Sequence, residues 1–251
     1  MKARDMLCYY AIRNNGDWEK IYKDVCDKVK ADDETVEEAL ATLKCNYITI
    51  LDDEYPQLLK QVYKPPFVLF YYGNIELLRN DNIVSFVGSR TISAYSQGAI
   101  SEVLSKTYKH NVIMSKLSKG VGNITTQYAY EKGMAQIVVM SSGIDNPYPY
   151  DSETRKLYDN IKDKPQALII SEYPNEVLAD QYTCATTNRI LGSKLNKEMF
   201  VVQVNKRSGS LLALNYALDS GIEVVVLPQP YTSDSANNTL IRDGAIPLVF
   251  E

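Results

Sequence analysis

The stretch Ile83-Val84-Ser85-Phe86-Val87-Gly88-Ser89-Arg90 decides how this chain folds. Its first five residues are mostly apolar and β-branched or aromatic, which is typical of a buried strand. A glycine then allows the backbone to approach a ligand closely, and a helix-like segment covers residues 93–109. The first amides of a helix are unpaired, and a neighbouring guanidinium binds phosphate through two parallel hydrogen bonds. The stretch therefore predicts an anion site, although turns of this kind also occur without a ligand in α/β proteins.

Apolar runs of the same kind recur after this stretch, and a helix-sized segment separates each from the next. The predicted strands are 83–87, 111–114, 136–140, 167–170, 199–204 and 223–227. Nearly continuous apolar strands that alternate with helices favour a parallel sheet covered on both faces. We therefore expect an α/β fold with a Rossmann-like, doubly wound, mostly parallel sheet. In such sheets, ligands bind at the rim formed by the loops that follow the carboxyl ends of the strands.

The first 46 residues have a different pattern. They contain two or three short segments with apolar residues at helical spacing, separated by polar turns. We expect a small helical N-terminal domain at 1–46 and the Rossmann-like domain at 47–251. Two extended pieces, 47–51 and 67–72, begin the second domain.

Composition excludes several classes of protein. No apolar run reaches the roughly 18 to 20 residues that span a bilayer, and no signal-peptide core follows the first residues, so we expect a cytoplasmic protein without membrane contact. The cysteines are far apart and only one histidine is present, which predicts neither a metal site nor a disulfide framework. The cysteines are Cys8, Cys26, Cys45 and Cys184.

Charge allows nucleic-acid binding only at a local surface. The 27 basic residues are outnumbered by 31 acidic ones, for a net charge of −4, which is unlike a general nucleic-acid binder. The predicted rim nevertheless carries glycines, serines and basic residues. In chain order its loops are Gly88-Ser89-Arg90, residues 115–120, Ser142-Gly143-Ile144-Asp145, Ser171-Glu172-Tyr173-Pro174, Thr187-Asn188-Arg189 and residues 206–211.

With the segments that precede them, these loops resemble the DprA/Smf family of DNA-processing proteins over about residues 47–251. The order of the matching segments is unbroken, and the ordered set is specific although each segment alone is not. The matching segments are Tyr55-Pro56 with Leu59, residues 65–74, Val87-Gly88-Ser89-Arg90, Gly143-Ile144-Asp145 with Tyr148-Pro149, Ser171-Glu172-Tyr173-Pro174, Asn188-Arg189-Ile190, residues 208–212 and residues 240–245.

The chain departs from the family pattern at several polar positions. The pattern Gly-Leu-Ala-x-Gly-Ile-Asp is replaced by residues 116–122, which begin with lysine and end with glycine. We expect no counterpart of the family's winged-helix tail. The substituted positions are Gly122 for an aspartate, Thr126 for a histidine, Thr187 for the first arginine of Arg-Asn-Arg, Gln181 for an upstream lysine and Gln229 for a glycine.

The resemblance implies a protein that binds single-stranded DNA in natural transformation and recombination. It further implies delivery of that DNA to the RecA recombinase, a homodimer, no catalytic chemistry and no cofactor. The DNA-binding residues carried over from the pattern are Gly88, Ser89, Arg90, Asn188, Arg189, Lys206, Arg207, Ser208 and Gly209.

Residue chemistry agrees with this kind of binding. Arginines beside a glycine turn suit phosphate contacts, which set affinity without reading sequence. Tyr148, Tyr173 or Tyr182 offers a face on which a base stacks. Tyrosine is abundant in this chain, so burial in the core or at an interface is the alternative role for each of them.

An enzyme is not predicted. The chain has no Walker loop, no G-x-G-x-x-G and no nucleophile elbow. His110 precedes a predicted strand and lies away from the rim, and Glu172 and Asp145 suit turn capping or pairing with arginine. Two further functions stay open: an interaction protein that keeps the fold but has lost DNA affinity, and a Rossmann-like protein that binds a nucleotide ligand.

The end of the chain predicts an assembly. Residues 238–245 have the pattern of a short helix, and residues 246–250 have that of an apolar strand. A monomer would leave this strand near an exposed sheet edge. We therefore expect a homodimer that buries apolar residues from the last quarter of the chain.

Overall fold

A single mixed sheet organises the computed structural model, which describes residues 2–249. Its strand order is β1-β2-β6-β5-β4-β3-β7-β8-β9. The strands from β6 to β9 run parallel, and the hairpin of β1 and β2 is added antiparallel at one edge. The strands are β1 Asn46–Thr49, β2 Val68–Gly73, β3 Ile83–Val87, β4 Val112–Lys116, β5 Gln136–Val139, β6 Ala167–Ser171, β7 Glu198–Val201, β8 Glu223–Val226 and β9 Ile246–Pro247.

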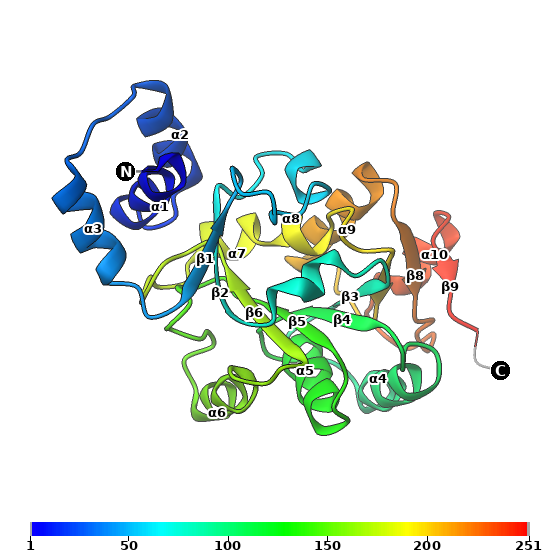
Figure 1. The fold of residues 1–251 in the computed structure, drawn as a ribbon. Coiled ribbons are helices and arrows are strands. Elements are labelled where there is room, and N and C mark those ends of the chain that lie inside the picture. Colours follow the sequence, from blue (N-terminus) through cyan, green and yellow to red (C-terminus); the bar gives the residue numbers. More distant parts are fainter. Residues whose placement is uncertain (1, 250–251) are drawn as a thin grey trace.

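Helices cover both faces of this sheet, with α4, α5 and α6 on one side and α7, α8 and α9 on the other (Figure 1). The expected α/β, doubly wound and mostly parallel fold is confirmed. The helices are α1 Ala3–Arg13, α2 Trp18–Cys26, α3 Asp33–Ala41, α4 Ala94–Lys106, α5 Val121–Glu131, α6 Ser152–Ile161, α7 Gln181–Thr186, α8 Asn188–Leu191, α9 Ser210–Asp219 and α10 Asn237–Arg242, with the 3-10 helices η1 Leu59–Gln61 and η2 Ile75–Arg79.

The alternation of side chains in β3 shows how the two layers are held. Ile83 and Val87 pack into a cluster that includes residues of α8 and α9. Val84 and Phe86 point the other way, into a cluster with α4 and α5. All five residues of β3 are buried, so this strand is fixed from both sides, as a central parallel strand requires.

The three amino-terminal helices pack beside the β1 and β2 edge (Figure 1). Asp17 caps α2 through its carboxylate, and Asp32 caps α3 in the same way. Leu7 and Ala11 of α1 share a hydrophobic cluster with Phe70 of β2 and Leu157 of α6. The helices therefore bury their apolar faces against the main sheet, and the proposed boundary between 1–46 and 47–251 stays a prediction.

The direction of winding reverses beside β3. From β3 the chain moves outward through β4, β5 and β6, and it then returns to place β7 on the other side of β3. Such a reversal leaves an opening at the carboxyl ends of the two diverging strands. The loop that begins at Gly88 and the loop that follows Val201 both start at this point.

The described residues contain neither a membrane-spanning helix nor a cluster of metal-ligating side chains. No helix within residues 2–249 is both long and apolar enough to cross a bilayer. Across the same residues, no group of three or more histidine, cysteine or acidic side chains is arranged to hold a metal ion.

Candidate phosphate-binding site

Gly88 begins the site at the carboxyl end of β3. A Cβ at this position would lie 2.3 Å from Val121 Cγ2 and 2.9 Å from the carbonyl oxygen of Gln203. The Gly88 carbonyl oxygen accepts a hydrogen bond of 2.6 Å from the Ser210 hydroxyl at the start of α9. Three segments of the chain therefore meet here so closely that only glycine fits.

Ser89 joins the turn after β3 to the loop after β7. Its amide donates to the Gln203 carbonyl over 2.7 Å, and its hydroxyl accepts from the Asn205 amide over 3.1 Å. The side chain is only 6% exposed. Ser89 thus positions the two predicted loops next to each other, with its own hydroxyl already engaged.

Basic side chains on these loops are open to solvent. Arg90, Lys206 and Arg207 are exposed, and among residues 2–249 they form no ion pair. Ser208 is partly buried and accepts a hydrogen bond of 3.3 Å from the Ser210 amide, while Gly209 is exposed. Unpaired arginine and lysine side chains beside one turn provide local positive charge on an acidic protein.

A small hollow lies under these loops. Its volume is about 30 Å³, which is room for a water molecule or a phosphate oxygen and too little for a nucleobase. Helices α5 and α9 both begin at its wall, each after a glycine. Their first amides are bonded to neighbouring loops, the Val121 amide to the Ser89 carbonyl over 3.3 Å and the Ser210 amide to the Ser208 hydroxyl over 3.3 Å. The hollow is lined by Phe86, Val87, Gly88, Lys116, Ser118, Gly122, Asn188, Leu191 and Ser210.

Lys116 is the charged residue in the wall of the hollow, and it was not among the predicted site residues. It ends β4, is mostly buried, and donates a hydrogen bond of 2.6 Å from Nζ to the Cys184 carbonyl in α7. Burial lowers the pKa of Lys116 to about 8, the Cys184 thiol opposes this, and the positive charge of Arg90 adds to the lowering. The available signal was a basic residue two positions after the predicted strand 111–114.

The loop after β4 interlocks with the turn after β3. Gly120 has φ 72°, and a Cβ there would lie 2.3 Å from the Ser89 carbonyl oxygen. A Cβ at Gly122 would lie 2.0 Å from the carbonyl oxygen of Lys116. The position that carries aspartate in the family pattern therefore has no space for a side chain in this chain.

Asn188 forms another part of the wall. Its side-chain amide donates to the Cys184 carbonyl over 3.1 Å and to the Gly209 carbonyl over 3.3 Å. The residue is 5% exposed. Asn188 therefore links α8 to the start of α9 and to the same carbonyl that Lys116 contacts.

Arg189 is not on an exposed rim, contrary to the expectation from sequence. Its side chain is 2% exposed and forms an ion pair with Glu172. Its guanidinium also donates to the carbonyl oxygens of Lys64 and Thr186, each over 2.7 Å. Because α8 turns this side chain inward, Arg189 joins three segments of the fold. Of the two roles that the sequence left open for Glu172, turn capping and pairing with an arginine, the structure shows the pairing.

The three tyrosines proposed for base stacking differ in exposure. Tyr173 is 2% exposed, so that hypothesis is wrong for Tyr173. Tyr182 on α7 is 49% exposed, and Tyr148 is partly buried with its ring edge-on to Tyr150. Tyr182 is two residues from Cys184, whose carbonyl contacts Lys116 in the wall of the hollow. Along the chain, Tyr182 is therefore the stacking candidate nearest to the hollow.

The residues at the substituted positions have partners inside the protein. Thr126 is buried and bonds to Ser115 over 2.8 Å. Thr187 is buried and donates to the Thr183 carbonyl over 2.7 Å. Gln229 is 6% exposed and donates to the Val202 carbonyl over 3.1 Å. None of the three offers a free polar group to the rim.

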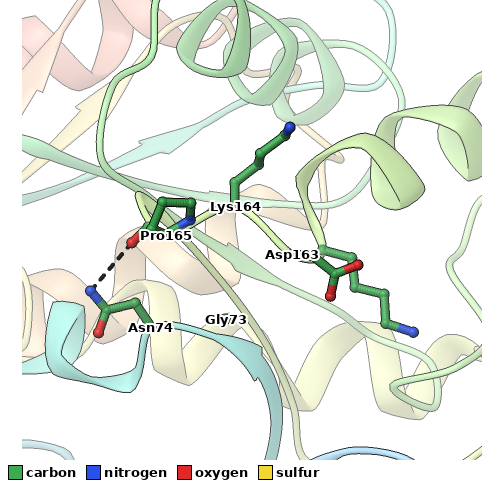
Figure 2. Close-up of a pocket in the computed structure, with 6 residues that line it drawn as sticks. Gly73, Asn74, Asp163, Lys164 and Pro165 are labelled. Atoms are coloured by element: carbon green, nitrogen blue, oxygen red, sulfur yellow. Dashed lines mark hydrogen bonds between the residues drawn. The ribbon is translucent and has the colours of Figure 1, made fainter.

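A larger depression of about 410 Å³ lies elsewhere. It is lined by Gly73, Asn74, Lys162, Asp163, Lys164 and Pro165, at the amino end of β6. Figure 2 shows the Asn74 amide bonded to the Pro165 carbonyl, over 3.3 Å, and the side chains of Asp163 and Lys164 extending away from each other. Because parallel strands bind ligands at their carboxyl ends, and this depression lies at the amino end of β6, the small hollow is the better site.

Residues 46–249 match the family model described as DNA recombination-mediator protein A. The chain belongs to this family. The DNA processing protein DprA of Streptococcus pneumoniae is 32% identical over 200 residues, which is 78% of this chain and 68% of that protein. DprA of Bacillus subtilis is 30% identical over 205 residues, 80% of this chain and 67% of that protein. The expected membership of the DprA/Smf family is confirmed.

Solved structures agree with this assignment. The X-ray structure of DprA from Streptococcus pneumoniae superposes with a TM-score of 0.76 at 25% identity, covering 97% of this chain and 89% of that one. DprA of Helicobacter pylori, described for its single-stranded DNA binding mode, superposes with a TM-score of 0.70 at 23% identity, covering 81% and 91%. The second likeness concerns the fold alone.

Proposed function

We propose that this protein binds single-stranded DNA with little sequence preference, in natural transformation and recombination. The observation that carries the proposal is a set of exposed cations, Arg90, Lys206 and Arg207, on two loops joined through Ser89 beside the hollow. Within residues 2–249 these cations form no ion pair. Phosphate contacts of this kind bind a strand without reading its bases. The family membership supports the same function.

Within this proposal the predicted residues have different roles. Arg90, Lys206 and Arg207 contact backbone phosphates, and Tyr182 stacks on a base. Arg189 stabilises the fold behind the site and does not touch DNA. The remaining predicted residues shape the loops and the hollow, and they are Gly88, Ser89, Asn188, Ser208 and Gly209.

The proposal is tested by titrating a labelled oligo-dC with the wild-type protein at several salt concentrations. Binding should weaken as the salt concentration rises. Arg90→Ala should weaken binding further, and it should reduce the slope of the logarithm of the binding constant against the logarithm of the salt concentration by about 0.7 in magnitude. Lys106→Ala removes an exposed cation at the far end of α4, and this control should bind like wild type. Absence of binding at low salt would overturn the proposal and favour an interaction protein or a nucleotide-ligand binder.

We further propose that the bound strand is passed to the RecA recombinase and that the protein acts as a homodimer. The family resemblance supports both points. RecA filament formation on oligo-dC covered by a single-strand binding protein is the measurement for the first. Unchanged filament formation upon addition of this protein would contradict the transfer.

A further inference from the structure

We infer that Lys116 supplies the cation that holds a phosphate oxygen in the hollow, an inference that rests on the proposed function. The lysine ends β4 at the rim and lines the hollow together with Ser118, Asn188 and Ser210. A lysine ammonium has three donors, and among residues 2–249 only the Cys184 carbonyl accepts one of them. Two donors are therefore available to an anion that enters.

Lys116 joins the end of β4 to α7. In the DprA/Smf pattern a glycine stands where this chain has Lys116, and a lysine stands where it has Gln181 at the start of α7. Here α7 provides no cation at that position, but its Cys184 carbonyl holds the ammonium of Lys116.

The surroundings of Lys116 are suited to an anion. Arg90 faces it from the loop after β3 and Cys184 from α7, and both influence its charge. Around the rest of the hollow, α5, α8 and α9 contribute uncharged groups, and no carboxylate of the described residues lines the wall. A phosphate oxygen there meets a desolvated ammonium, where a charge-assisted hydrogen bond is strong.

This arrangement predicts proton uptake on binding. Burial lowers the pKa of the unoccupied Lys116 to about 8, and a bound phosphate raises it because the opposite charge favours the protonated form. Above about pH 8 the protein must therefore take up a proton when it binds. Affinity should fall as pH rises through this range, by up to about tenfold per pH unit.

The test compares Lys116→Met, Lys116→Arg and Lys119→Met, all in a Cys184→Ser background, because Cys184 influences the charge of Lys116. Lys119 is an exposed lysine of the same loop, paired with Asp151 at 3.6 Å and outside the hollow. Dissociation constants for labelled oligo-dC are measured by fluorescence anisotropy from about pH 7 to about pH 9. Thermal stabilisation by tripolyphosphate is measured in parallel.

At neutral pH we expect Lys116→Met to weaken oligo-dC binding by about ten- to hundredfold, the usual worth of a charge-assisted hydrogen bond. Lys116→Arg should bind with little dependence on pH, since arginine stays protonated. Lys119→Met should keep the wild-type pH dependence. If Lys116→Met binds within about twofold of its parent, or keeps the parent's pH dependence, the inference is overturned.

The tripolyphosphate measurement separates this inference from the proposed function. If oligo-dC does not bind, but tripolyphosphate stabilises the parent protein and not Lys116→Met, the hollow is an anion site, Lys116 is its cation, and the DNA-binding function is wrong. If neither ligand binds, both are wrong. Loss of folding does not obscure the result, because methionine in place of a buried ammonium removes a desolvation cost.

Discussion

Burial decides what an arginine does in this protein. Arg189 is held by Glu172 and two carbonyl groups in the interior, whereas Arg90 is exposed and unpaired. Removing one partner of a buried ion pair costs about 3–5 kcal/mol. We therefore expect Arg189→Met to lower the free energy of unfolding by about this amount in urea denaturation, and Arg90→Ala to change it by less than about 0.5 kcal/mol.

The double variant Arg189→Met with Glu172→Gln controls for the charge left behind. It should recover part of the lost stability, because the uncompensated buried carboxylate is gone. Similar unfolding free energies for Arg189→Met and Arg90→Ala would contradict the structural role of Arg189. If a folded Arg189→Met protein binds oligo-dC more weakly than wild type, Arg189 belongs to the DNA-binding residues.

The burial of Lys116 also predicts a pH dependence of stability. Its pKa is lowered from 10.5 to about 8 in the folded protein, so between these values the unfolded chain binds more protons and the free energy of unfolding rises with pH. Lys116→Met removes this dependence. The stability of the variant relative to wild type should be greatest below about pH 8 and should decline as pH approaches 10.5.

Urea denaturation of both proteins at several pH values measures this difference directly. Subtracting one protein from the other removes the contributions of tyrosine side chains that titrate in the same range. A difference that does not change between neutral and alkaline pH would show that the ammonium is not desolvated in the folded state.

At the scale of elements, the turn after β3 depends on glycine. A Cβ at Gly88 meets the Gln203 backbone and Val121, whereas a Cβ at Gly98 within α4 meets nothing within 4 Å. Gly88→Ala should therefore destabilise the protein and weaken oligo-dC binding, since the loops must move apart. Gly98→Ala is the matched control, and it should stabilise by about 0.5–1 kcal/mol because alanine favours a helix. If Gly88→Ala and Gly98→Ala change the stability equally in thermal and urea unfolding, the close packing at Gly88 is contradicted.

The same elements show what the sequence could and could not predict. Strand β3 was predicted with its observed bounds, because polar turn residues mark both ends of its apolar run. Strand β4 was predicted to end at residue 114 but continues to Lys116, because backbone pairing with Val138 and Val139 of β5 is indifferent to side-chain polarity. The run 199–204 is longer than strand β7, which ends at Val201 where its neighbour β3 also ends.

The candidate site was predictable as a set of loops and not as a set of contacts. Gly88 and Arg90 lie where the sequence predicts them, since strand ends and glycine turns are local features. The inward direction of Arg189 depends on Glu172 and on the Lys64 carbonyl, which is 125 residues away. The contact between Lys116 and Cys184 spans 68 residues. No periodicity or local spacing encodes such pairings.

At the scale of the whole molecule, the sheet has two different edges. The β1 edge is covered in part by the amino-terminal helices, whose apolar side chains join the main cluster. At the β9 edge, Ile246 is 45% exposed and Val249 77% exposed, and Leu218 of the nearby α9 is 59% exposed. Residue 250, part of the predicted terminal strand, lies outside the described residues. Apolar side chains at an open strand edge favour association with another chain.

We expect this edge to form a homodimer that buries at least about 1,000 Å² in total. Two-fold pairing would place two copies of the site on one particle, so that a continuous strand engages both and binds more tightly without any new contact.

Ile246→Lys should shift the protein toward monomer in sedimentation and weaken binding of a long oligo-dC more than that of a short one. Leu51→Lys changes an apolar residue that follows β1 and is 57% exposed, against 45% for Ile246. This variant is the control and should leave the assembly unchanged. A wild-type protein that sediments at 28.3 kDa at tens of micromolar would contradict the dimer, and the exposed β9 edge would then require a different partner.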